Sequence, residues 1–422
     1  QISLVVTFAI FSGVYVQAVP KPPLEQELAK AGAIQDWLVD VRRELHQCPE
    51  LQYNLTTTSA AVRRHLDELG IKYSYPFAQV GIVATIGSGS GPTVALRADM
   101  DALPILEEHD WSFKSKNHGN MHACGHDAHM TMLLGAARLL KEREAQLPGT
   151  VRLIFQPAEE GGAGGEAMVK EGVLDGADAV FAMHVWPWLD SGRVASRPGT
   201  LLAGAATFEI AVHGRGGHAA MPHKTRDPVV AASAIVLALQ TLVSRETSPL
   251  GSAVVSVPVF RAGDAHNVIP NKVTLEGTMR ALTVEDMDRL RRRIGEVAKA
   301  QAESFGCSAD TSFEMYYPPT VNAASAFEHA AATYRRMVAD ASLFEETEPV
   351  MPAEDFSFMA QRAPGCMVFL GIRNETAGSV HALHTPLFTM DESMLPRGAA
   401  LHTALAAEFL ARGAAPAPKA EL

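Results

Sequence analysis

Short apolar runs of strand length alternate with longer stretches of helical periodicity along most of the chain, and this alternation limits its fold more than any other feature. Four runs between residues 31 and 202 predict strands: 80–87, 93–99, 150–155 and 177–183. A helix is predicted between the second and third, from apolar residues at helical spacing: Met130, Leu133, Leu134, Ala137 and Leu140. Strands that alternate with helices predict an α/β domain built on a mostly parallel sheet, with helices on its faces.

The rhythm changes between residues 203 and 317, where the predicted order is strand, helix, two strands, helix and strand. This β-α-β-β-α-β order is that of a small ferredoxin-like unit. The α/β pattern resumes afterwards, with predicted elements at 325–339, 366–372 and 396–410. The sequence therefore predicts one α/β domain in two parts, 31–202 and 318–412, with the small unit of residues 203–317 inserted between them.

Composition excludes several classes of protein. Hydrophobic residues make up 47% of the chain and charged residues 20%, which is typical of a globular protein. The formal net charge of −11 argues against nucleic acid as a partner, because phosphate binding requires a basic face. Four cysteines are too few for a disulfide scaffold.

The two ends of the chain suggest a cellular location. Residues 1–18 form an apolar run that closes on small residues, which predicts a signal peptide that is incomplete at its front. The run is short for a membrane span, so no span is expected in the mature chain. A flexible tail is predicted at 413–422, and its last four residues, KAEL, resemble the Lys-Asp-Glu-Leu retention signal. The expected location is the lumen of the endoplasmic reticulum, with secretion or the cytoplasm as alternatives.

Candidate metal ligands stand at the carboxyl ends of several predicted strands. Asp99 and Asp101 end the second strand. Glu159 and Glu160 follow the third, and His184 comes directly after the fourth. In open α/β sheets, ligands bind outside the carboxyl ends of the strands. The spacing therefore predicts that these side chains meet at one edge of the sheet.

Residues 121–130, MHACGHDAHM, add a cysteine and three histidines to the same region. Five histidines fall within residues 109–129, although the whole chain has only 16. Cys124 near a helix start suggests a nucleophile, and the cluster also suggests a structural zinc site. The other cysteines are scattered singly, and neither alternative accounts for the acids and His184 at the same edge. A catalytic metal centre accounts for all of them.

Nine motifs occur in the order typical of one family. They are RADMDALP (97–104), MHACGHDAHM (121–130), QPAEEGGAGG (156–165), AMHVWP (182–187), GRGGHAAMPH (214–223), HNVIP (266–270), GTMR (277–280), EDFSFM (354–359) and HALHTP (381–386). The chain resembles the aminoacylase/carboxypeptidase-type dinuclear metal amidohydrolases. Within them it is similar to the auxin (IAA)-amino acid conjugate hydrolases of plants and their bacterial hippurate hydrolase relatives. The resemblance runs from about Trp37 to Arg412.

The resemblance implies two divalent metal ions held by five residues: Cys124, His126, Glu160, His184 and His384. Cys124 takes the bridging role that a carboxylate has in the wider clan. That clan has a histidine ligand where Asp99 stands, so Asp99 and Asp101 are expected to orient histidine ligands instead. His122 and His129 are expected to have no metal role. A thiolate and imidazoles favour zinc, but the resemblance points to Mn²⁺, with Zn²⁺ or Co²⁺ as alternatives.

The remaining expected site residues act on the substrate. Two adjacent divalent cations activate a water and polarise a carbonyl, and a free carboxylate must then carry the water's proton to the leaving nitrogen. Glu159, beside the ligand Glu160, is the expected base. The resemblance implies that His218 stabilises the oxyanion, often in the partner subunit's site. It also implies that Asn267 and Arg280 hold a substrate carboxylate.

The function implied is that of a metal-dependent amidohydrolase. Its expected substrate is a small N-acyl amino acid conjugate, of the IAA-amino acid or hippurate type, which it cleaves to a free carboxylic acid and an amino acid. A dipeptidase or carboxypeptidase on the same scaffold and a non-catalytic ligand-binding protein are the alternatives. The inserted unit of residues 203–317 is expected to be a lid and homodimerisation domain, hinged near 199–204 and 318–319.

Overall fold

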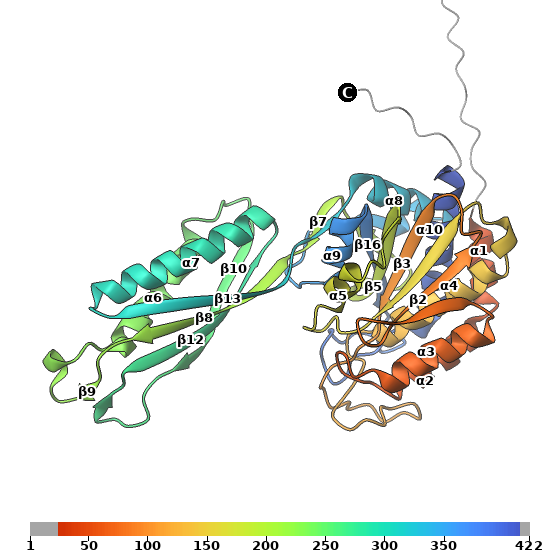
Figure 1. Ribbon diagram of the computed structural model, residues 1–422. Coiled ribbons are helices and arrows are strands. Elements are labelled where there is room, and N and C mark those ends of the chain that lie inside the picture. Colours follow the sequence, from red (N-terminus) through yellow and green to blue (C-terminus); the bar gives the residue numbers. More distant parts are fainter. Residues whose placement is uncertain (1–23, 414–422) are drawn as a thin grey trace, which may run out of the picture.

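The computed structural model describes residues 24–413, so the expected signal peptide (1–18) and KDEL-like tail lie outside the described residues. The described residues form two separate bodies, each built on one larger sheet, and a narrow connection joins them (Figure 1). Among the described residues, no helix is both long enough and apolar enough to cross a membrane.

The larger body is built on an eight-stranded sheet. Its spatial order is β1 (Lys72–Phe77), β2 (Gly81–Gly87), β4 (Thr150–Gln156), β3 (Thr93–Asp99), β5 (Ala179–Asp190), β16 (Gly365–Arg373), β6 (Val194–Ser196) and β15 (Phe344–Glu346). The central strands β4, β3, β5 and β16 are parallel to one another, while β1, β2 and β6 pair antiparallel. β3 is almost wholly buried, as expected of a strand covered on both faces.

Helices cover both faces of this sheet. One face carries the main core, which includes residues of α2 (Gln35–His46), α3 (Thr56–Glu68), α4 (His126–Lys141), α8 (Ala324–Met337) and α10 (Leu395–Gly413). The other face packs on α5 (Gly164–Lys170) and α9 (Phe356–Arg362). The short helix α1 (Glu25–Gly32) lies against α10. The α/β fold class predicted from the sequence is confirmed.

The smaller body is a four-stranded antiparallel sheet in the order β10 (Ala253–Arg261), β12 (Lys272–Ala281), β8 (Gly204–His213) and β13 (Ser308–Tyr317). The helices α6 (Pro228–Ser244) and α7 (Val284–Ser304) pack together on one face of it (Figure 1). Burial alternates along β12, because its other face has no helix over it. The expected β-α-β-β-α-β insertion is present.

Two short strands join the bodies. β7 (Gly199–Leu202) pairs with β14 (Thr320–Asn322) on the larger side, and β8 and β13 continue directly from them into the smaller body. One expectation about the strands was wrong. His184 was expected to follow a strand that ends at residue 183, but β5 runs on to Asp190, because β16 pairs with it through His184 and Val185.

Candidate metal centre and active site

The loop before α4 presents the first two expected ligands. Cys124 lies in this loop and His126 is the first residue of the helix. Gly125 between them has a φ of 88°, a conformation that side chains rarely adopt. A Cβ there would also lie 2.4 Å from Cγ2 of Val185. Glycine is therefore what allows the cysteine and the histidine to face the same edge of the sheet.

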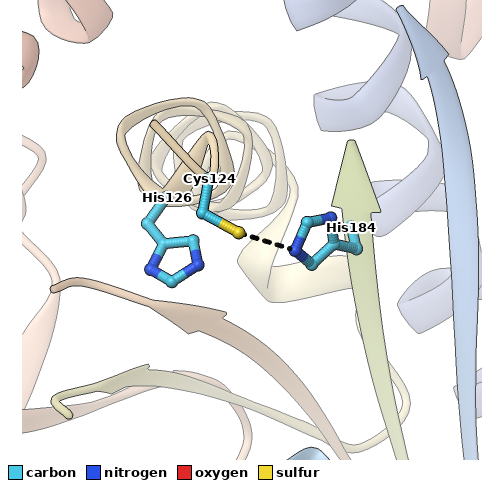
Figure 2. A group of neighbouring side chains, drawn as sticks. All are labelled: Cys124, His126 and His184. Carbon is cyan, nitrogen blue, oxygen red and sulfur yellow. Dashed lines mark hydrogen bonds between the residues drawn. The ribbon is translucent and has the colours of Figure 1, made fainter. Parts of the chain in front are cut away.

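The other expected ligands come to the Cys124 thiol from distant segments. Nε2 of His184 on β5 lies 3.4 Å from the Cys124 sulfur, and Nε2 of His384 lies 3.3 Å from it. Oε1 of Glu160 is 3.2 Å from His384 Nε2. Figure 2 shows the Cys124 thiol directed at the ring of His184, with the ring of His126 on its other side. The structure thus brings all five expected ligands together.

These donors form two groups that share the cysteine. Cys124, His126 and His184 make one group, and Cys124, Glu160 and His384 make the other, with ligand atoms within 4.8 Å of one another in each. A shared thiolate between two sets of nitrogen and oxygen donors fits a pair of borderline-soft divalent cations. His384 adopts a φ of 59°, an unusual backbone conformation of the kind found at functional sites.

The histidine rings are oriented to coordinate. Nδ1 of His126 donates to the main-chain carbonyl of Asp101 at 2.8 Å, and Nδ1 of His184 donates to that of Val185 at 2.7 Å. A carbonyl can only accept, so in the neutral ring the lone pair is on Nε2. Nε2 of His126 is buried and has no hydrogen-bond partner among the described residues. The donor set fits a metal centre.

The charge environment disfavours a cysteine nucleophile. Burial raises the pKa of the Cys124 thiol well above its usual value, and the neighbouring carboxylates of Glu160 and Glu159 raise it further. A cysteine that is reactive without a bound cation requires the opposite shift, whereas a bound cation itself stabilises the thiolate. Burial also lowers the pKa of His184 well below its usual value, with His129 adding to the effect. His184 is therefore a neutral ring, as a metal ligand must be.

Glu159 and Glu160 lie on a turn after β4 that is held by Asp101. Both carboxylate oxygens of Asp101 accept main-chain N–H groups, from Glu159 at 2.9 Å and from Glu160 at 3.0 Å. Burial raises the pKa of Glu159 well above its usual value, and the nearby carboxylates of Glu354 and Glu160 add to the shift. A raised pKa is what a carboxyl needs if it is to accept a proton and give it away.

The two aspartates differ in what they orient. Asp101 orients His126 through its carbonyl, but its carboxylate holds the glutamate turn. Asp99 accepts from Nδ1 of His129 at 2.6 Å, and His129 Nε2 accepts the N–H of Val185 at 3.0 Å. Both nitrogens of His129 are thereby used within the protein. His122 is fully buried, and burial lowers its pKa to about 3.

A buried arginine, for which no role was predicted from the sequence, balances the acids. Arg97 donates to Asp99 at 2.8 Å, and to Glu354 and Asp355 at 2.9 Å each. Its side chain is only 1% exposed. Burial acts to lower the pKa of Arg97, but Glu354, Asp99 and Asp355 outweigh it and raise the pKa. A fixed positive charge therefore lies behind the cluster.

Four of the five expected ligands, all except His126, line a cleft of about 360 Å³ with an apolar wall. The wall is formed by seven side chains: Trp186, Trp188, Leu202, Tyr317, Pro352, Ala353 and Leu383. Trp186 stacks on Phe369 with ring centres 4.2 Å apart. Trp188, which is 57% exposed, contacts Trp186 with ring centres 4.7 Å apart. Trp186 and Leu383 fall within motifs noted in the sequence, whereas the others are single apolar residues with no pattern that marks them as parts of one wall.

The comparison with known proteins agrees with this geometry. Residues 95–408 match the model of peptidase family M20/M25/M40. The chain belongs to this family. It is 46% identical to IAA-amino acid hydrolase ILR1-like 4 of Arabidopsis thaliana over 391 residues, which is 91% of this chain and 88% of that protein. The family resemblance noted in the motifs is confirmed, and this M20 enzyme is a metal-dependent hydrolase of amide bonds.

Two solved structures support the same assignment. A putative aminohydrolase from methicillin-resistant Staphylococcus aureus superposes on this M20 enzyme with a TM-score of 0.87 and 34% identity, over 92% of this chain and 100% of that chain. A dinuclear metal-binding M20 peptidase from Bacillus subtilis superposes with a TM-score of 0.78 and 34% identity, over 90% and 99% of the two chains.

Three expected residues of this M20 enzyme lie outside the cleft. His218 on β9 (Gly217–His218) pairs with Val268 on β11 (Val268–Ile269), beside Asn267. Figure 1 places β9 at the end of the smaller body that is farthest from the larger one. Arg280 is on β12, opposite Ala205, and it donates to the main-chain carbonyl of Met279 at 3.0 Å. In this arrangement the single chain does not bring these three residues to the metal ligands.

Proposed function

We propose that this M20 enzyme hydrolyses the amide bond of N-acyl amino acid conjugates, releasing a free carboxylic acid and an amino acid. The observation that carries the proposal is a buried glutamate, Glu159, beside two groups of metal ligands at the floor of a cleft walled by tryptophans. An apolar acyl group fits that wall. The ammonium group of a dipeptide fits it poorly, because burying an unpaired charge is costly.

Each residue has a separate task in the proposed reaction. Two cations, when bound by the five ligands, supply Lewis-acid activation of water and of the amide carbonyl. Glu159 takes the proton of the attacking water and delivers it to the leaving nitrogen. Asp101 fixes the main chain of Glu159, so that the base is placed before the substrate arrives. We propose Mn²⁺ as the cation, with Zn²⁺ or Co²⁺ as the alternatives.

The smaller body is proposed to be a lid and a dimerisation domain. The outer face of α6 exposes apolar side chains, with Val230 50% and Leu237 73% exposed. The edge strand β10 lies next to this helix in the fold. A second copy related by a two-fold axis would cover this face. His218 of one subunit then serves the cleft of the other, and Asn267 and Arg280 hold the substrate carboxylate.

One substrate panel tests the proposal. Indole-3-acetyl, benzoyl and fatty-acyl conjugates of one amino acid are compared with dipeptides, with and without a chelator. We expect the aromatic acyl conjugates to have the highest kcat/KM, and the chelator to abolish the activity. Dipeptides that are cleaved faster than every N-acyl conjugate would establish the peptidase alternative. Metal analysis of protein purified without added ions identifies the cation, and full activity with zinc but none with manganese would exclude Mn²⁺.

The expected location in the endoplasmic reticulum depends on residues outside the described range and stays a prediction.

A further inference from the structure

The last strand of the smaller body ends in a tyrosine that is bonded to the turn of the proposed base. Tyr317 closes β13, where it pairs with Ala205 of β8, and it is only 6% exposed. Its hydroxyl donates to the main-chain carbonyl of Glu159 and accepts the N–H of Gly161 at 2.8 Å. A side chain from one body therefore holds the catalytic turn of the other.

Tyr317 is placed where the motion of the lid would begin. Pro318 and Pro319 follow it, and β14, which pairs with β7 of the larger body, starts at Thr320. On the neighbouring segment, a Cβ on Gly204 would lie 2.9 Å from Pro319 Cδ, so the two crossing segments touch. Prolines restrict the main chain at this point. Any rotation of the lid about the crossing therefore moves Tyr317 relative to the turn that it holds.

The turn needs such outside support. Ala158 and Ala163, which flank it, have φ values of 55° and 51°, and neither is glycine. Such conformations are unfavourable for residues with a side chain and persist only where the surroundings impose them. The Asp101 carboxylate imposes the turn from the side of the larger body, and Tyr317 imposes it from the side of the lid.

We propose that Tyr317 is a positioning residue that couples the angle of the lid to the placement of the Glu159 carboxyl. The proposal rests on the proposed role of Glu159 as the base. Tyr317 lines the cleft, but its one hydroxyl proton is committed to the Glu159 carbonyl and is not available to a substrate. Phe358 packs at right angles to the Tyr317 ring, with ring centres 6.3 Å apart, and keeps it in place.

The test is Tyr317→Phe, which keeps the ring and removes the hydroxyl. We expect kcat to fall by about tenfold or more, since a misplacement of a catalytic group by about 1 Å can cost on the order of 10²-fold in rate. KM and metal content should stay near wild type. The matched control is Tyr334→Phe, because Tyr334 is also buried and its hydroxyl donates to Gly192 at 2.5 Å and accepts from Arg397 at 3.0 Å. The control should lower Tm by a similar amount and leave kcat unchanged.

A double variant separates positioning from a general structural role. If Tyr317 acts through Glu159, adding Tyr317→Phe to Glu159→Gln should lower kcat no further. A full extra loss in that background, an unchanged kcat in Tyr317→Phe, or a loss of metal from it would each overturn the proposal. Pro318→Gly, which loosens the link but keeps the hydroxyl, should also lower kcat. A wild-type kcat in Glu159→Gln would instead show that Glu159 is not the base. That result would overturn both the coupling and the proposed mechanism.

Discussion

At the scale of single residues, Cys124 is the position on which both donor groups depend, because its thiol belongs to each of them. Glu159, one residue from the ligand Glu160, belongs to neither group that contains the thiol. Replacing these two side chains should therefore impair the enzyme in different ways.

Glu159→Gln should lower kcat by about 10²–10⁴-fold, the usual contribution of general acid–base catalysis, and should leave the metal content unchanged. Cys124→Ala should lower the metal content together with the activity. Steady-state kinetics and elemental analysis of the same preparations check both expectations. An empty centre in Glu159→Gln, with both ions kept in Cys124→Ala, would reverse the assigned roles.

Arg97→Met should destabilise the metal-free protein by about 3–5 kcal/mol, because it leaves buried carboxylates without their counter-charge. Urea unfolding measures this. The control is Arg293→Met, which breaks exposed ion pairs with Glu246 at 2.7 Å and with Glu296 at 2.5 Å and should cost much less, because exposed pairs contribute little to stability. If both variants lost the same free energy of unfolding, Arg97 would not stabilise the protein by neutralising the buried carboxylates.

The family resemblance singled out the expected ligands, but nothing in the sequence singled out two of the side chains that support them. Cys124, His126 and Glu160 stand in dense local patterns of metal-binding residue types, which one segment is enough to display. Arg97 and Tyr317 were not foreseen, because each acts through a partner that is more than 150 residues away, Glu354 for one and Glu159 for the other. A lone arginine in a strand or a lone tyrosine near a hinge has no signature until the fold brings the partner to it.

At the scale of elements, the start of α4 and the strand β5 depend on each other. Gly125 fits against Val185 of β5 with no room for a side chain. The alternation of strands and helices was readable from apolar periodicity, but the length of β5 was not. The strand continues past His184 because β16 pairs with it, and that pairing is a property of the folded sheet.

Gly125→Ala should therefore disturb the loop that presents Cys124 and His126. The added Cβ would lie 2.4 Å from Val185, and the φ of 88° adds strain. We expect lower metal content and a lower Tm. Gly295→Ala in α7 is the control, since nothing lies within 4 Å of its Cβ position, and it should raise stability by up to about 1 kcal/mol. Full metal occupancy in Gly125→Ala would contradict this role of the glycine.

At the scale of the whole molecule, the two bodies stand apart, with β9 at the far end of the smaller one (Figure 1). If His218 acts in the partner's site, two inactive variants should restore each other. Mixed and refolded Glu159→Gln and His218→Ala subunits should recover about a quarter of the wild-type activity, since half of random dimers are mixed and each has one intact site. Activity no greater than that of either parent would exclude action between subunits, and a fully active monomer would exclude the dimer.

Arg280 tests the closure of the lid in another way. Arg280→Ala should raise KM by about 10- to 100-fold for substrates with a free carboxylate, since charge-assisted pairs contribute about 1.5–3 kcal/mol. It should change KM far less for the matching amides, which have no carboxylate to hold. Equal effects on acid and amide substrates would refute the clamp.

The insertion of the smaller body also sets the order in which the protein can be completed during synthesis. Every residue from Gly204 to Tyr317 leaves the ribosome before β16, the strand that closes the sheet beside β5, and before the last ligand, His384. The inserted unit has its own core, so it can fold while the larger sheet is still unfinished. A nascent chain stalled before residue 365 would hold a folded insertion on an open sheet and only four of the five ligands, so the capture of the second ion waits for the final part of the chain.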